Sequence, residues 1–204
     1  PNCGKTTLFN RLTGGKEKVG NYPGVTVEKK VGHARLDDGR LIEIVDLPGT
    51  YSLLARSPDE RITRDVLLGR MPGTPRPDLV INVIESISLE RNLYLSFQLI
   101  ELGFPVLVGL TMIDRAAELG LAIDAAGLAG ELGVPVIPVS GLRGDGVPAL
   151  LEAATAHDGR LSSRLELPSS LLEEARALAN RIGAARGADP LTVLAEAAIL
   201  IARE

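Results

Sequence analysis

The first seven residues, PNCGKTT, contain the Gly4-Lys5-Thr6 triplet, which narrows the possible folds of this chain more than any other feature. The heptapeptide matches the second half of G-x-x-x-x-G-K-S/T, a loop whose backbone N–H groups surround phosphate. Leu8 and Leu12 follow at helical spacing, and a helix N-terminus directly after such a loop attracts anions. We therefore predict a phosphate-binding loop that leads into a helix over residues 5–12. Because a buried strand precedes such a loop, we expect the sequence to be truncated at its N-terminus.

Composition sets the class of protein. The chain has 204 residues, of which 45% are hydrophobic and 24% charged, and this is typical of one globular α/β domain with a small appendage. Its formal charge of -4 and the lack of a dense Lys/Arg cluster argue against nucleic-acid binding. Cys3 is the only cysteine, so a disulfide framework is excluded and a reducing, cytosolic compartment is favoured. Apolar runs are too short to cross a bilayer, so we expect this piece to be soluble.

Apolar runs and turn residues alternate along the first three quarters of the chain. Short β-branched runs predict buried strands, and glycine or proline joints separate them from helical patterns. This alternation favours an α/β fold with a mostly parallel sheet covered by helices on both faces, and ligands then bind at the carboxyl ends of the strands. Besides residues 5–12, we predict helices at 57–69, 89–102, 124–132 and 146–156, strands at 26–36, 40–46, 78–84, 104–110 and 134–139, a loop at 16–25 and a hairpin turn at 37–39.

The pattern changes after about residue 160. Residues 169–185 and 190–203 are rich in Ala, Leu, Glu and Arg and carry no strand signal. They predict two helices separated by a turn that contains Gly187 and Pro190. We therefore divide the chain into a nucleotide-binding domain at 1–160 and a short helical segment at 161–204.

Asp46 ends a buried strand, where a carboxylate is costly unless it meets a positive charge or a metal ion. Lys5 reaches phosphate as a point charge and Thr6 offers a hydroxyl, so Mg²⁺ held near Asp46 and Thr6 is the favoured interpretation. Pro48 and Gly49 follow, and the Gly49 amide can turn toward a terminal phosphate. An ordinary acid before a Pro-Gly turn is the alternative.

Thr26 ends the polar loop NYPGVT at residues 21–26. Its hydroxyl can complete the Mg²⁺ ligands only when a terminal phosphate is present, which would make this loop a switch. A plain strand residue is the alternative.

Asp114 follows a predicted buried strand and can accept both N1–H and N2–H₂ of guanine, a pairing that adenine cannot offer. Thr111 stands where an asparagine is usual, and its hydroxyl makes one polar contact to the loop or the base. Residues 140–142 follow the last predicted strand and are expected to supply backbone contacts to the base. A plain turn is the alternative there.

Taken together, these motifs resemble the N-terminal cytosolic G domain of the FeoB family of bacterial ferrous iron transporters. The similarity spans residues 1 to about 156, and the trailing helices resemble the start of the family's helical domain. The segments that carry it are 1–10 (first motif), 19–30 (first switch), 46–53 (third motif) and 89–95 with Gln98 and Leu99.

The resemblance implies a P-loop GTPase that binds GTP and GDP with Mg²⁺ and hydrolyses GTP slowly, stimulated by K⁺ bound at Asn2. It also implies a membrane-spanning iron-permease region in the same polypeptide, small Feo accessory proteins as partners, and a place at the cytoplasmic face of the bacterial inner membrane. Thr50 follows Gly49 where a water-orienting glutamine would otherwise stand, so water positioning falls to backbone groups and turnover is expected to be slow.

The predicted site has three parts. Lys5, Thr26 and Gly49 are expected to act in catalysis, and Thr6, Thr26 and Asp46 to hold Mg²⁺. The full set predicted to bind nucleotide or ions is Asn2, Cys3, Gly4, Lys5, Thr6, Thr7, Gly24, Val25, Thr26, Asp46, Pro48, Gly49, Thr111, Met112, Asp114, Ser140, Gly141 and Leu142.

Two other functions stay open from the sequence, and a third is disfavoured. One is a related GTPase of ribosome assembly or tRNA modification, which a basic appended domain would favour. Another is a guanine-nucleotide sensor that does not hydrolyse GTP, which Thr50 permits. An adenine-specific enzyme is disfavoured by Asp114.

Overall fold

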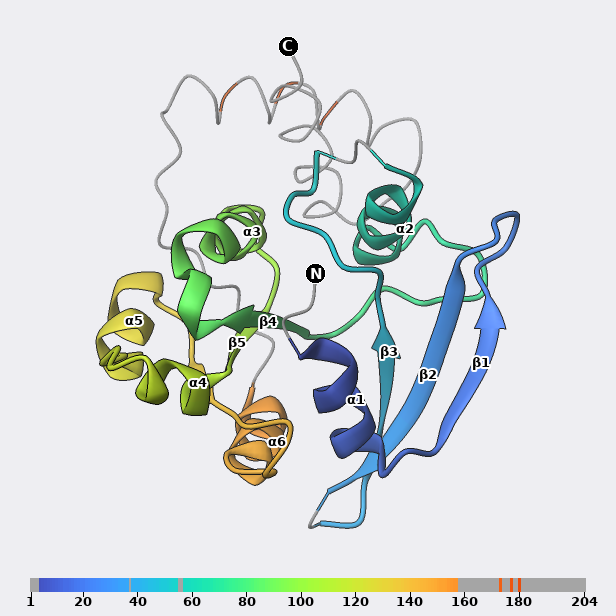
Figure 1. The fold of residues 1–204 in the computed structure, drawn as a ribbon. Helices are drawn as coiled ribbons and strands as arrows, with labels where there is room; N and C mark the ends of the chain where they lie inside the picture. Colours follow the sequence, from blue (N-terminus) through green and yellow to red (C-terminus); the bar gives the residue numbers. More distant parts are fainter. Residues whose placement is uncertain are drawn as a thin grey trace.

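The computed structural model describes residues 4–36, 38–54 and 57–157, together with the single helical positions Glu173, Ala177 and Asn180. Figure 1 shows α1 between two groups of strands, with β1, β2 and β3 on its right and β4 and β5 on its left. In chain order the elements are α1 (Lys5–Thr13), β1 (Glu17–Asn21), β2 (Glu28–Arg35), β3 (Leu41–Asp46), α2 (Pro58–Leu67), β4 (Val80–Glu85), the 3₁₀ turn η1 (Ser86–Ser88), α3 (Leu89–Glu101), β5 (Val106–Thr111), α4 (Ile113–Glu118), α5 (Ala125–Leu132), β6 (Val136–Pro138) and α6 (Val147–Ala156).

Strands β4, β5 and β6 form a parallel sheet. Val80 pairs with Val106 and Val108 with Val136, so β5 lies between its two neighbours. All six residues of β5 are buried, which is typical of a central parallel strand with helices on both faces. The parallel sheet predicted from the strand–helix alternation is confirmed here.

Strands β1, β2 and β3 form a second, antiparallel sheet. The predicted hairpin joins β2 to β3, and Gly39 adopts φ 85° in its turn. The prediction of a loop over residues 16–25 is wrong, because β1 pairs with β2 from Glu17 to Asn21. This strand lies at the sheet edge and four of its five residues are exposed, so it carries no apolar alternation that a sequence pattern can detect.

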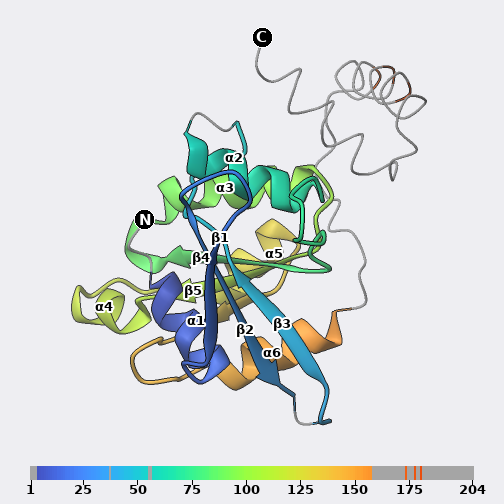
Figure 2. The ribbon, with the colours of Figure 1, turned by 90° about the vertical axis from the view of Figure 1, so that its right-hand side faces the viewer.

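Helices cover both faces of the parallel sheet, as predicted. On one face, Leu8 and Leu12 of α1 pack with Val147 and Leu150 of α6. On the other face, Leu99 and Ile100 of α3 and Leu132 of α5 pack against β4 and β5. Figure 2 shows α1 and α6 on one side of the strands and α3 and α5 on the other.

A groove of about 600 Å³ separates the two sheets. It is lined by residues of β3 and β4, including Ile42, Ile44, Ile81 and Val83, and by α1. Among the described strands, β3 pairs only with β2 and β4 only with β5. The edges of β3 and β4 therefore face this groove without a strand between them.

The predicted helices and strands within residues 5–157 end within two residues of the observed ones. Helix α4 was not predicted because its six residues are too few for a clear helical period. The helices predicted at 169–185 and 190–203 lie outside the described residues, apart from the helical positions Glu173, Ala177 and Asn180. No helix in the described part of the chain is long and apolar enough to cross a membrane.

Candidate nucleotide-binding site

Lys5 and Asp46 meet at the start of α1. Gly4 precedes the helix in the left-handed conformation with φ 77°, which favours glycine because it has no Cβ. The Lys5 ammonium then donates a hydrogen bond to Oδ1 of Asp46, the last residue of β3. Only 9% of the Asp46 side chain is exposed, so this ion pair supplies the positive partner that a buried carboxylate needs.

Thr111 at the end of β5 lies beside Gly4. A Cβ placed on Gly4 would be 4.0 Å from Cβ of Thr111. Thr111 is buried, and its hydroxyl donates to the carbonyl of Ile84 at 2.9 Å. The Thr111 hydroxyl thus joins the ends of β5 and β4. Its proton is directed into the sheet and not toward a nucleotide base.

Asp114 lies in the first turn of α4, after a strained residue. Met112 has φ 58° and is the only non-glycine residue with positive φ in the described ranges. Its carbonyl accepts a hydrogen bond of 2.9 Å from the hydroxyl of Ser86, which is buried at the end of β4. This contact stabilises a conformation that costs roughly 1–2 kcal/mol. Ser86 was not predicted, although a serine directly after a buried strand was a usable signal.

The loop at residues 140–146 packs against α1. A Cβ on Gly141 would be 3.1 Å from Cγ2 of Thr7, so only a residue without a side chain fits there easily. The Arg11 guanidinium donates to the carbonyls of Gly141 (3.3 Å) and Leu142. Ser140 is buried and its hydroxyl accepts from the backbone N–H of Arg143 at 3.2 Å. Arg11 was missed because an exposed helical arginine gives no sequence signal of a partner so far along the chain.

The loop that contains Gly24, Val25 and Thr26 connects β1 to β2. Gly24 adopts φ 77°, and all three residues are exposed. Tyr22 anchors the loop, because its side chain is buried against Ile62 and Val66 of α2. Figure 1 shows the tip of the β1–β2 hairpin away from the start of α1. Within the described residues, no hydrogen bond or ion pair joins this loop to Lys5 or Asp46.

Tyr22 has an unusual environment for a polar side chain. It is 1% exposed, and its hydroxyl has no hydrogen-bond partner among the described residues. Burial, and to a lesser degree the negative charge of Asp46, raises the pKa of Tyr22 to about 12. The phenol is therefore neutral at physiological pH.

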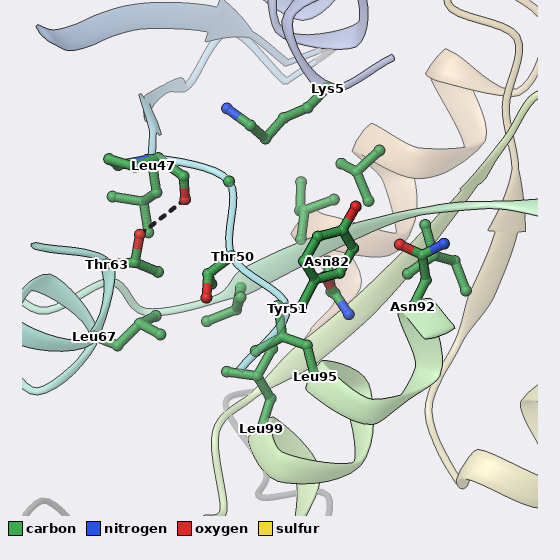
Figure 3. A pocket seen from close by; sticks show the side chains of 16 residues that line it. Lys5, Leu47, Thr50, Tyr51, Thr63, Leu67, Asn82, Asn92, Leu95 and Leu99 are labelled. Carbon is green, nitrogen blue, oxygen red and sulfur yellow. Dashed lines mark hydrogen bonds between the residues drawn. The ribbon is translucent and has the colours of Figure 1, made fainter. Parts of the chain in front are cut away.

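Residues 47–54 cross from β3 toward α2 and lie over a small cavity. The cavity has a volume of about 90 Å³, and its lining includes Lys5, Gly49 and Tyr51 together with residues of β4 and α3. Figure 3 shows Lys5 at one end of this cavity and Leu95 and Leu99 of α3 at the other. The carbonyl of Pro48 accepts a hydrogen bond of 2.9 Å from the hydroxyl of Thr63, and Gly49 is exposed.

The predicted residues that the structure describes lie in four places. The structure brings Gly4, Lys5, Thr6, Thr7, Asp46, Thr111 and Gly141 together around the start of α1. Pro48 and Gly49 lie in the segment after β3 and line the same cavity as Lys5. Met112, Asp114, Ser140 and Leu142 lie in the two loops that follow β5 and β6. Gly24, Val25 and Thr26 lie in the β1–β2 loop, and Asn2 and Cys3 lie outside the described residues.

A divalent cation with oxygen ligands suits the donors at the start of α1. Asp46 supplies a largely buried carboxylate, and Thr6 supplies a hydroxyl in the same helical turn as Lys5. No cluster of three or more His, Cys, Asp or Glu side chains occurs in the described ranges. The donors present therefore fit an ion that also takes oxygen ligands from a phosphate and water, as Mg²⁺ does.

Comparison with known sequences identifies relatives over most of the chain. The profile of one family, described as ferrous iron transport protein B (FeoB), matches residues 1–154. The Fe(2+) transporter FeoB of Legionella pneumophila (strain Lens) is 50% identical over 157 residues, which are 75% of this chain and 20% of that protein. The Fe(2+) transport protein A/Fe(2+) transporter FeoB fusion protein of Porphyromonas gingivalis is 48% identical over 161 residues, 78% of this chain and 18% of that protein. The chain thus spans about a fifth of the length of these relatives.

Solved structures agree with this similarity. The cytosolic domain of L. pneumophila FeoB superposes with a TM-score of 0.85 at 40% identity, covering 98% of this chain and 84% of that one. The cytosolic domain of T. maritima FeoB in its GMPPNP form superposes with a TM-score of 0.78 at 38% identity, covering 94% and 75%. The fold is therefore that of a P-loop GTPase, and the chain belongs to the FeoB family of ferrous iron transport proteins.

Proposed function

We propose that this chain binds GTP and GDP and hydrolyses GTP slowly, as the cytosolic switch domain of a ferrous iron transporter. The observation that carries the proposal is the Lys5–Asp46 ion pair directly after the left-handed Gly4, in a chain of the FeoB family. An ammonium beside a free helix N-terminus attracts phosphate, and the carboxylate next to it suits a metal ion. The cytosolic domain of T. maritima FeoB has been solved in GDP and GMPPNP forms, which supports a guanine nucleotide as ligand.

The residues around the phosphates then have separate roles. Lys5 contacts the outer phosphates, Thr6 and Asp46 hold Mg²⁺, and Thr26 joins them when the β1–β2 loop moves toward the phosphate. Gly49 donates its backbone N–H to the terminal phosphate. Bound Mg²⁺ neutralises charge on the phosphates during transfer.

The base is recognised by the two loops after β5 and β6. Asp114 accepts from guanine, while Met112 and residues 140–142 supply backbone groups around the ring. Since the Thr111 hydroxyl donates to Ile84, we expect Asp114 to carry most of the discrimination against adenine.

Slow turnover follows from the residue after Gly49. The Thr50 hydroxyl donates to the carbonyl of Ser52 at 2.7 Å and lies 3.4 Å from Oε1 of Glu60 on α2, so this side chain is held by protein groups. The same observation favours a second candidate, a guanine-nucleotide sensor that does not hydrolyse GTP. We propose that K⁺ bound by Asn2 supplies positive charge that raises the rate of GTP hydrolysis.

The wider role rests on the relatives. We propose that residues 1–160 form the G domain and 161–204 the start of a helical domain, at the cytoplasmic face of the bacterial inner membrane. GTP binding would then regulate Fe²⁺ passage through a membrane-spanning region of the same polypeptide, with small Feo proteins as further partners.

Phosphate release from GTP, measured in K⁺ and in Na⁺ with Mg²⁺ present, tests the enzymatic proposal. We expect slow release that is faster in K⁺, and loss of binding and release in Lys5→Ala. Arg35→Ala, an exposed change on β2, serves as the matched control and should behave as the wild type. GTP binding without any phosphate release in either salt would favour the sensor, and absence of guanine-nucleotide binding would overturn both.

A further inference from the structure

The segment Leu47–Leu54 is held from two sides. On the α2 side, the hydroxyl of Thr63 donates to the carbonyl of Pro48. On the α3 side, two side chains of one helix contact the far end of the segment. Gly49 lies between these points of attachment, exposed and beside the cavity that Lys5 also lines.

Gln98 makes the first contact from α3. Its Oε1 accepts a hydrogen bond of 2.9 Å from the backbone N–H of Leu53. The Leu53 side chain is 1% exposed and packs in the main core with Leu99 and Ile100 of the same helix. A backbone N–H at such a place is costly to leave without an acceptor, so Gln98 fixes the position of Leu53.

Arg91 makes the second contact. Its guanidinium carbon lies 4.0 Å from the centre of the Tyr51 ring, a distance suited to a cation–π interaction. Arg91 and Gln98 are seven residues apart on α3, so the two side chains project from the same face of the helix, about two turns apart. Tyr51 and Leu53 are two residues apart in the segment, and α3 contacts both of them. The contacts therefore form a pair that sets both the position and the direction of residues 51–53.

We infer that Gln98 and Arg91 are positioning residues that make the site distinguish a nucleoside triphosphate from a diphosphate. This inference rests on the proposed function. With Pro48 attached to α2 and residues 51–53 attached to α3, little freedom is left for Gly49 between them. The backbone N–H of Gly49 is thereby presented to the terminal phosphate, which a diphosphate lacks.

An isosteric pair of variants at Gln98 tests this inference. Gln98→Leu removes the acceptor for the Leu53 N–H, whereas Gln98→Glu keeps an oxygen there. In the 204-residue chain with Mg²⁺ present, we expect Gln98→Leu to weaken binding of GMPPNP about tenfold, the effect of one hydrogen bond. The Kd for GDP should change less than twofold, and Gln98→Glu should bind both nucleotides as the wild type does.

Controls separate the possible failures. Phe97→Ala changes an exposed side chain of α3 that lies about 100° around the helix from Gln98, and it should leave both affinities unchanged. If the wild type binds neither nucleotide, the proposed function fails. If the wild type binds both and Gln98→Leu changes neither affinity or both alike, the inference is wrong.

Arg91 provides an independent variant at an exposed position, where loss of folding is not expected. Arg91→Met should weaken GMPPNP binding a few-fold without affecting GDP binding. Arg91→Lys should weaken GMPPNP binding less than Arg91→Met does, because a cation remains over the Tyr51 ring. Equal loss for GMPPNP and GDP in Arg91→Met would show a general structural role and contradict the inference.

Discussion

Tyr22 is the residue whose environment departs most from ordinary behaviour in this domain. Its hydroxyl is buried without a hydrogen-bond partner among the described residues. We predict that Tyr22→Phe stabilises the protein by about 1 kcal/mol at pH 7, because it removes the desolvation cost of that group. Urea denaturation of both proteins measures the difference. Tyr94→Phe, at an exposed tyrosine, is the control and should change stability by less than about 0.5 kcal/mol.

The raised pKa of Tyr22 gives a second prediction at this residue. The phenol titrates near its ordinary pKa of 10 in the unfolded chain and at about 12 in the folded one. This pKa difference leaves the free energy of unfolding unchanged well below pH 10. The free energy of unfolding falls as the pH rises toward 12, because the unfolded state then releases a proton that the folded state retains. Tyr22→Phe removes this loss, so its advantage over the wild type should grow by about 1.4 kcal/mol between pH 7 and pH 11. A constant difference across this range would contradict the assignment.

At the scale of elements, the contact between α1 and β2 depends on a glycine. A Cβ on Gly32 would lie 2.3 Å from Cγ2 and 2.8 Å from Cβ of Thr13, and 3.2 Å from the ring of Phe9. We predict that Gly32→Ala destabilises the fold by about 1–3 kcal/mol, the usual cost of overpacking. Adding Thr13→Ser removes the nearest methyl group and should recover part of the loss.

A double-mutant cycle by chemical denaturation measures this coupling between α1 and β2. Gly20→Ala on β1 is the matched control, because a Cβ there meets nothing within 4 Å. If the changes in the free energy of unfolding caused by Gly32→Ala and Thr13→Ser are additive, α1 and β2 are not in steric contact at this point.

At the scale of the whole molecule, the two sheets should differ in local stability. All six residues of β5 are buried; they pair with β4 along the whole strand and with β6 at Val108, Gly109 and Leu110, whereas β1 is an exposed edge strand. We predict that amides of Val106–Thr111 exchange with solvent only on global unfolding, while those of Glu17–Asn21 exchange much faster through local opening. Hydrogen exchange followed by mass spectrometry or NMR tests this, and equal protection of β1 and β5 would refute it.

Much of this architecture follows from local sequence patterns. Glycine and proline joints mark the helix ends, and β-branched runs mark β4, β5 and β6, so their bounds were predicted within two residues. The strand β1 was not predicted because pairing at an edge depends on the partner strand and not on its own polar residues.

The candidate site was predictable only in part. The motif residues were identified, and Lys5 does meet Asp46. The contacts that support them were not, because Ser86 with Met112 and Gln98 with Leu53 join residues that only the tertiary fold brings together. The β1–β2 loop lies away from Lys5 because Tyr22 anchors it on α2, which no local pattern reveals.

The groove between β3 and β4 has a consequence for how the two sheets are joined. Backbone groups at an unpaired strand edge can hydrogen-bond with another strand, and the side chains around this opening are largely aliphatic. Ile42, Ile44, Ile81 and Val83 are each only partly buried there. A strand placed in this opening would pair with β3 and β4 at once and bury these side chains, so that the two sheets would become one continuous sheet.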